Sequence, residues 1–374
     1  MGKKKPAGKP AASQAAVVEQ PSQPSQAPAA HRPRSRAPLV RFALLGVGAV
    51  CALVVAAIVA WRARVPLESE LRPWVIAGFL PEYRTESRNV PMLCWRTSHL
   101  ILFSIEIDGD TGALAETGRL DEAFRRLPNR PRHCQVIVAV GGDGRSAGFA
   151  PMAASAKKRA AFVDALREIY GEAADGVELN WQYPSSMQEL KNLQALVREI
   201  KQKLPHWQVS MAVAPDEGFA AAIKEAGLAR QFDLFHVMAY LGGNGEAYDR
   251  AVGALGKVIK HLPANMTTLG IAFFGQSSDG AAYSYEDTIV HEERFTEDER
   301  RAVRAVEEQV SLAFAKQLAG VSLWELGQDC RDRVVGDHLA TCRGRSPLVD
   351  AVARKSWTLR GGGSGDELPP LPPL

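Results

Sequence analysis

The stretch DGVELNWQYP, residues 175–184, decides the fold. Side chains alternate between the two faces of a β-strand, so Glu178, Asn180 and Gln182 share one face, and Val177 and Leu179 share the other. Three polar side chains on an inner face would each cost about 1–3 kcal/mol if they were buried without partners. A strand that rises to a functional site explains this pattern, and a purely structural polar network is the alternative.

Apolar runs of strand length recur along residues 72–355, and helical patterns separate most of them. The strand-like runs are Val75–Leu80, Leu100–Ser104, Val136–Val140, Gly176–Asn180, Val209–Ala214, Leu234–Ala239, Leu269–Phe274 and Gly320–Leu323. The helical patterns include Ala156–Tyr170, Ser186–Leu204, Gly218–Ala229, Tyr248–His261 and Thr296–Leu318. Eight strands that alternate with helices predict an α/β fold, a (β/α)8 TIM barrel, over residues 72–360.

A membrane span is predicted ahead of the barrel. Residues 42–61, FALLGVGAVCALVVAAIVAW, contain no charge and no proline, and Trp61 suits a membrane interface. Twenty helical residues span about 30 Å, the thickness of the hydrocarbon core. We expect an uncleaved signal anchor, a single transmembrane helix. The alternatives are a buried core helix, a cleaved signal peptide or a mitochondrial transit peptide.

The segments around the span set the expected orientation. Residues 1–41 are rich in Ala, Pro, Ser and Lys, which is typical of a disordered tail. More positive charge precedes the span than follows it, so we expect a type II protein with its barrel lumenal or extracellular. Residues 62–71 form a linker, and residues 361–374 form a Gly/Pro-rich tail. The formal net charge of +3 is concentrated before the span, so no nucleic-acid partner is predicted.

Residues 175–184 resemble the signature DGxDxDWEYP, which lies on the fourth barrel strand of the family 18 glycoside hydrolases. The matching residues are Asp175, Gly176, Trp181, Tyr183 and Pro184. Further landmarks follow in the family's order. They are Ala139-Val-Gly-Gly142 for SxGG, Met238-Ala-Tyr240 for MxY, Leu269-Gly-Ile-Ala-Phe-Phe-Gly275 for LGxPxYG, and Gly320-Val-Ser-Leu-Trp324 for the eighth strand. The resemblance implies a chitinase-like barrel.

Departures from the signature matter more than the matches. Gln182 stands where the family has its proton-donating Glu, and Asn180 stands where the family has the Asp that orients the substrate's acetamide. Glu178 replaces the deeper Asp, and Leu241 replaces the Asp that commonly follows MxY. A carboxamide has no proton to give in this range, so the resemblance implies that no catalytic set is intact. The alternative is an active hydrolase of chitin-like polysaccharide that uses another acid, such as Asp216, Glu217 or Glu325.

Sugar binding remains possible without catalysis. The resemblance implies ligand contacts from Tyr183, Met238, Tyr240 and Trp324, and the amides of Asn180 and Gln182 can hydrogen-bond hydroxyls or an acetamide. The predicted function is that of a pseudoenzyme, which binds N-acetylglucosamine-containing glycans or acts as a scaffold for a protein partner. The structural alternative is that Trp324 only packs the barrel and the two amides only bond each other. No motif predicts a cofactor or a metal.

Four cysteines follow the predicted span, and three pairings are open. We favour Cys94–Cys134 and Cys330–Cys342 in an oxidising compartment, with four free thiols as the alternative. Asn265-Met-Thr267 is an acceptor sequence for N-glycosylation and fits a domain outside the cytosol.

Overall fold

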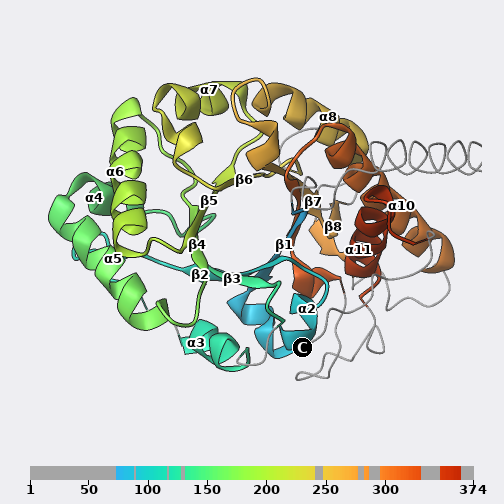
Figure 1. Cartoon of the computed structure of the whole chain (residues 1–374), viewed down its shortest axis with the longest axis horizontal. Helices are drawn as coiled ribbons and strands as arrows, with labels where there is room; N and C mark the ends of the chain where they lie inside the picture. Colours follow the sequence, from blue (N-terminus) through green and yellow to red (C-terminus); the bar gives the residue numbers. More distant parts are fainter. Residues whose placement is uncertain are drawn as a thin grey trace, which may run out of the picture. The chain divides into compact units, whose positions relative to one another are not determined.

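The computed structural model contains a closed barrel of eight parallel strands with helices around it (Figure 1). It describes residues 73–87, 90–115, 118–127, 131–240, 247–276, 282–285, 295–329 and 346–363. The barrel strands are β1 (Val75–Pro81), β2 (His99–Ile105), β3 (Gln135–Gly141), β4 (Gly176–Asn180), β5 (Gln208–Val213), β6 (Leu234–Val237), β7 (Thr267–Ala272) and β10 (Gly320–Trp324). Because β1 pairs with both β2 and β10, the ring is complete, and the predicted (β/α)8 barrel is confirmed.

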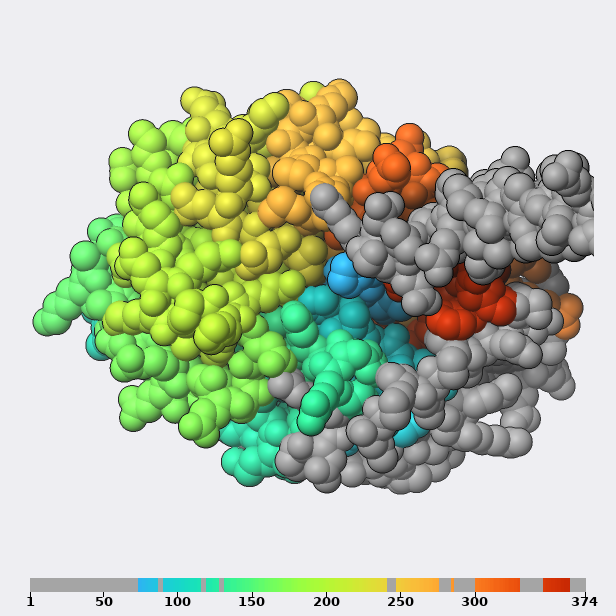
Figure 2. Space-filling view, in the orientation of Figure 1, coloured from blue at the N-terminus to red at the C-terminus, as the bar shows by residue number. Residues whose placement is uncertain are grey.

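Helices form the outer layer, as Figure 1 shows, and in the space-filling view the part of the chain from α4 to α8 runs from green to orange (Figure 2). They are α2 (Val90–Cys94), α3 (Gly118–Arg125), α4 (Phe149–Ala154), α5 (Ala156–Tyr170), α6 (Met187–Lys203), α7 (Glu217–Glu225), α8 (Ala247–Val258), α10 (Phe295–Ala315) and α11 (Pro347–Leu359). A short antiparallel hairpin, β8 (Phe274–Gln276) and β9 (Ala282–Ser284), follows β7.

The apolar core of the described residues consists of two clusters. The larger lies between strands and helices, and it takes Val177, Leu179 and Trp181 from alternate positions of the β4 segment. The smaller cluster fills the inside of the barrel and includes Phe79 and Phe103. Alternate residues of this segment therefore point to opposite faces, as predicted. The apolar side chains point outward and the polar ones point inward.

A pair of glycines lets β3 turn away from the barrel beside the site. Gly141 and Gly142 have φ values of 87° and 116°, which L side chains rarely adopt. A Cβ on Gly142 would lie 2.3 Å from the Phe103 ring, so the close approach also requires glycine. This turn delivers the loop of residues 143–148 to the mouth of the barrel.

Most sequence-based boundaries hold, with one clear difference. The predicted strand Leu269–Phe274 is divided between β7, which ends at Ala272, and the hairpin strand β8, which begins at Phe274. The backbone N–H of Phe273 donates to the Trp324 carbonyl oxygen at 2.8 Å, so the chain follows β10 for one residue beyond β7. The apolar character continues across the break, which is why the pattern did not reveal it.

A disulfide joins Cys94 and Cys134, with their Cα atoms 5.4 Å apart, and confirms that predicted pair. The pair Cys330–Cys342 lies outside the described residues, as do residues 1–71 with the predicted span at 42–61. Within the part of the chain that the structure describes, no helix combines the length and apolar character needed to cross a membrane. Asn265 is exposed in a short 3-10 turn, Ala264–Met266, just before β7.

Candidate functional site

A cavity of about 390 Å³ opens among residues at the carboxyl ends of the barrel strands. Barrel enzymes place their sites at this end. The lining residues come from nearly every strand and from the loops that follow them: Phe79, Tyr83, Phe103, Asp143, Arg145, Asn180, Gln182, Ala212, His236, Met238, Tyr240, Phe274, Ser322 and Trp324. Five of the residues predicted for ligand binding thus meet in one cavity, namely Asn180, Gln182, Met238, Tyr240 and Trp324.

Asn180 and Gln182 form a hydrogen-bonded amide pair. Gln182 Nε2 donates to Asn180 Oδ1 at 2.8 Å and approaches Met238 Sδ at 3.8 Å. Asn180 ends β4 and is buried, whereas Gln182 lies just beyond the strand and is partly exposed. The pair has no charge, so this part of the cavity presents fixed donors and acceptors without a titrating group.

Ser146 holds the amide pair from behind. Its hydroxyl donates toward the carbonyl oxygens of Gly142, at 2.9 Å, and Asn180, at 3.2 Å. The same oxygen accepts the backbone N–H of Gln182 at 3.0 Å. One side chain of the loop after β3 thereby fixes the end of β4.

Aromatic rings line another part of the cavity. The Trp324 ring lies 4.9 Å from Phe103 and 5.6 Å from Phe79, between centroids. Tyr240 contacts Phe274 edge to face at 5.8 Å, and its burial raises the pKa of its hydroxyl. Trp324 remains partly exposed, so one ring surface is available to the cavity. Flat apolar faces of this kind suit a sugar ring.

Two predicted positions lie apart from the cavity lining. Tyr183 is 37% exposed and packs edge to face against Phe219 on α7 at 5.5 Å. Asp175 precedes β4 and accepts the backbone N–H of Val136 at 2.7 Å, so it joins β4 to β3 at the opposite end of the strand. Both belong to the matched signature, and in this chain their described contacts are structural.

Glu178 lies deeper inside the barrel and is completely buried. Burial raises its pKa to about 8, although the Ser210 hydroxyl beside it acts in the opposite direction. Its register partners on β3 and β5 are Ala139 and Ser210, two small residues that leave room for a glutamate. At neutral pH the carboxyl group is therefore mostly protonated and uncharged.

His236 is a cavity residue that sequence reasoning missed. It shares the inner face of β6 with Met238, two positions later, and the period of two could have revealed it. Its Nε2 lies 3.8 Å from Glu178 Oε2, and its Nδ1 hydrogen-bonds Thr268 Oγ1 at 2.7 Å. Burial, with a smaller effect of His99, lowers its pKa to about 3, so this ring is neutral too.

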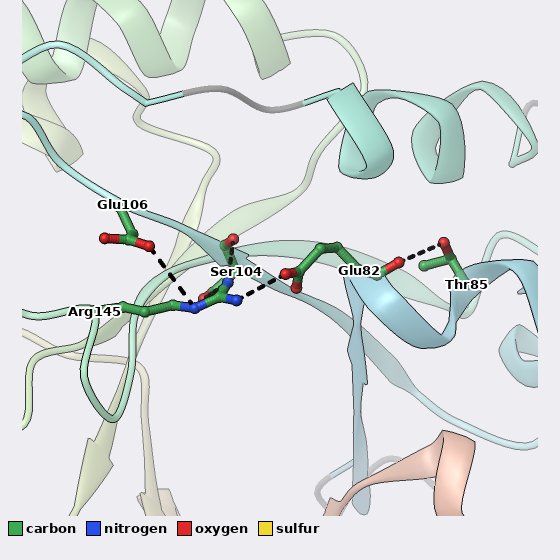
Figure 3. Close-up of polar contacts among 5 residues, drawn as sticks. All are labelled: Glu82, Thr85, Ser104, Glu106 and Arg145. Carbon is green, nitrogen blue, oxygen red and sulfur yellow. Dashed lines mark hydrogen bonds and ion pairs between the residues drawn. The ribbon is translucent and has the colours of Figure 1, made fainter.

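Arg145 is a charged residue of the cavity wall, and its partners hold it there from outside the lining (Figure 3). Arg145 Nη2 donates to Glu82 Oε1 at 2.8 Å, and Nη1 donates to the carbonyl and hydroxyl oxygens of Ser104, each at 3.3 Å. Its Nε lies 3.9 Å from Glu106 Oε1. Asp143, an exposed residue two positions earlier, also lines the cavity. Sequence reasoning missed Asp143 and Arg145 because loops carry no periodicity.

The three acids weighed as substitutes are occupied elsewhere. Asp216 caps α7 by accepting the Phe219 N–H at 2.7 Å, and Glu217 pairs with Lys260 at 3.2 Å. Glu325 is buried, accepts the Gly327 N–H at 2.7 Å and lies 3.3 Å from Arg84 Nε. None of the three is among the described cavity residues. The described side chains also contain no group of three His, Cys, Asp or Glu placed to hold a metal ion.

Comparison with known proteins agrees with this geometry. A sequence model of the family "Glycosyl hydrolases family 18" matches residues 76–329. Chitinase A1 of Niallia circulans is 25% identical over an alignment of 220 residues, which covers 46% of this chain and 31% of that protein. The chain thus spans about a third of the length of that relative.

Solved structures share the fold at low identity. A chitinase-like agglutinin from Robinia pseudoacacia superimposes with a TM-score of 0.58 at 18% identity, over 75% of this chain and 99% of that one. A class V chitinase from Nicotiana tobaccum, a glutamate-to-glutamine mutant in complex with NAG4, gives a TM-score of 0.56 at 16% identity, over 69% and 95% of the two chains. At such identities these likenesses establish the barrel fold.

Proposed function

Because this chain belongs to the glycosyl hydrolases of family 18, we propose that it is a catalytically silent member that binds N-acetylglucosamine-containing glycans in the cavity. The observation that carries this proposal is the amide pair of Asn180 and Gln182, at signature positions where the family has carboxylic acids. Without a proton donor at position 182, the glycosidic oxygen receives no general acid help, which is typically worth about 10²–10⁴-fold in rate.

The missing donor is not replaced by Glu178, Asp216, Glu217 or Glu325. Glu178 holds a proton at neutral pH, but it is buried and is not among the cavity-lining residues. Asp216, Glu217 and Glu325 are engaged in capping and ion pairs. Asp143 does line the cavity, and it supports a second candidate function, an active hydrolase of chitin-like polysaccharide in which Asp143 supplies the acid.

Glycan binding is supported by what the cavity keeps. The bond within the amide pair uses one donor of Gln182 and one acceptor of Asn180, so each amide retains capacity for a sugar hydroxyl or acetamide. Trp324 and Tyr240 supply ring surfaces. Two structural relatives support the idea by their descriptions, because one is an agglutinin and the other holds NAG4 although a glutamate has been replaced by glutamine.

Calorimetric titration of the full-length chain with N-acetylated chitotetraose tests glycan binding. Turnover of a fluorogenic chitotrioside tests whether the chain lacks hydrolase activity. We expect saturable binding, no turnover, and loss of binding in Trp324→Ala. Tyr248→Ala, which removes an exposed aromatic ring from α8, is the matched control and should bind normally. If the wild type turns over substrate and Asp143→Asn abolishes the turnover, the active hydrolase is correct. A folded chain that binds no glycan would favour the protein-scaffold alternative.

We also propose that this domain acts outside the cytosol, anchored as a single-pass type II membrane protein. The apolar, uncharged residues 42–61 and the positive charge before them support this. The sequence at Asn265, on an exposed turn, allows glycosylation there. In sealed vesicles of the expressing cells, protease added from the cytosolic side should leave the barrel intact until detergent is added. Digestion without detergent would rule out this topology.

A further inference from the structure

Arg145 is fixed in the cavity wall by hydrogen bonds to two other parts of the chain. It belongs to the loop after β3, Glu82 directly follows β1, and Ser104 lies near the end of β2 (Figure 3). The contacts to Glu82 and Ser104 are within hydrogen-bond distance, and the Arg145 side chain is only 30% exposed. The guanidinium therefore has one defined position at the mouth of the barrel.

The fixed guanidinium retains an unused donor. A guanidinium carries five N–H groups in a planar fork. Its hydrogen bonds, one to Glu82 and two to Ser104, and the approach of its Nε to Glu106 at 3.9 Å account for at most four of them. Arg145 also lines the cavity that contains Asn180 and Gln182, so a donor is left for an occupant of that cavity.

The charge of Arg145 is already balanced. The hydrogen bond to Glu82 is the main cause of a raised pKa at Arg145, and Glu106 contributes in the same direction. Glu82 and Glu106 lie behind Arg145, outside the cavity lining, and Asp143 is a carboxylate of the lining itself. An acidic ligand would be repelled by these carboxylates as well as attracted by the cation, whereas a neutral hydroxyl or carbonyl oxygen needs only the donor.

We propose that Arg145 is a ligand-binding residue, which donates to a neutral oxygen of the bound glycan, and that its clamp by Glu82 makes the cavity select uncharged glycans over acidic ones. This inference rests on the proposed glycan binding and adds a specificity to it. The ligand class is a neutral oligosaccharide.

The chain offers a matched control in Arg159. That residue donates to the Glu199 carboxylate and to the Ala153 carbonyl oxygen, each at 2.8 Å, among the outer helices. Arg145→Gln and Arg159→Gln therefore each remove a carboxylate and a carbonyl contact, but only the first changes the cavity. Titration of the full-length chain with chitotetraose should show affinity lowered about 10–100-fold in Arg145→Gln, the equivalent of a charged hydrogen bond, and unchanged in Arg159→Gln.

Arg145→Lys keeps the charge and serves as a second test if Arg145→Gln does not fold. It should also bind weakly, since an ammonium group cannot bridge Glu82 and Ser104 and still reach the ligand. Melting temperatures identify variants that are merely unstable. If the wild type binds chitotetraose and both Arg145 variants, once folded, bind equally well, then Arg145 is only structural and this inference is wrong, while the proposed function stands.

Selectivity is tested with Glu82→Gln and a second probe, O-carboxymethylated chitotetraose. The wild type should prefer the neutral tetrasaccharide, and the variant should lower that preference several-fold, because Arg145 is then less neutralised. An unchanged preference ratio would refute the role of the clamp. A wild type that binds neither probe would overturn the proposed function and this inference with it.

Discussion

At the scale of single residues, Asn180 and Gln182 act as one unit. We expect no turnover of a fluorogenic chitotrioside by the wild type and little by Gln182→Glu alone. A glutamate at position 182 needs a raised pKa to stay protonated, and a carboxylate at position 180 would supply that shift. The double variant Gln182→Glu with Asn180→Asp should therefore exceed the product of the two single effects. Equal rates in the double variant and in Gln182→Glu would contradict this coupling.

Glu178 gives the fold a pH dependence of its own. The pKa of Glu178 in the folded state, about 8, lies above its reference value of 4.5, so the folded state binds a proton more tightly than the unfolded state. The contribution of this proton to the free energy of unfolding is therefore lost as the pH rises from about 4.5 to 8. His99 and His236, with pKa values lowered to about 4 and 3, remove stability as pH falls below 6.5. Stability should thus be greatest near pH 6.5.

The variant Glu178→Gln should remove the alkaline part of this profile. Between pH 6.5 and 8 the wild type should lose about 1.4 kcal/mol per pH unit through this group, and the variant should lose almost none of it. Urea unfolding at both pH values measures the difference, with the surface substitution Glu217→Gln as control. A parallel loss in both proteins would show that Glu178 is not the cause.

At the scale of elements, helix α11 depends on a residue from outside its own sequence. Ser346 precedes the helix without a side-chain cap, and the backbone N–H groups of Leu348 and Val349 instead donate to the buried carboxylate of Asp329, each at 3.1 Å. Asp329→Ala should lower the free energy of unfolding by about 2–4 kcal/mol, because two buried donors lose a charged acceptor.

Asp216→Ala, which removes an exposed cap from α7, is the matched comparison. It should cost only about 1 kcal/mol. Chemical denaturation of both variants provides the measurement. Equal losses would mean that Asp329 is no more than an ordinary helix cap.

Residues on or directly after strands could in part be predicted from the sequence, whereas residues in loops could not. The β4 strand was predicted with its observed bounds, since its polar and apolar residues alternate and glycine and tryptophan frame it. Asn180 and Gln182 were identified from the alternation in β4, and Met238, Tyr240 and Trp324 from the resemblance to the family's motifs. Asp143 and Arg145 were missed, because the direction of a side chain in a loop depends on tertiary contacts. For the same reason Tyr183, which was expected in the cavity, packs against Phe219 instead.

At the scale of the whole molecule, one covalent link constrains the barrel. The Cys94–Cys134 disulfide closes a loop with a sequence separation of 40 residues, from the end of α2 to the start of β3. Replacing both cysteines with alanine should lower the free energy of unfolding by about 2–4 kcal/mol. Denaturation with and without reductant checks this, and Cys51→Ser should leave the midpoint unchanged. If reduction leaves the wild-type midpoint where it was, the link contributes nothing to stability.

The closed ring of strands also limits how another protein can associate with this one. An open sheet has edges whose unpaired backbone groups can accept an additional strand from a partner. In the described barrel β1 is paired on one side with β2 and on the other with β10, so every barrel strand has two neighbours. A partner chain therefore cannot add a strand to the barrel. A protein that docks on this domain must recognise the side chains of its helices and loops, or pair with the separate hairpin of β8 and β9.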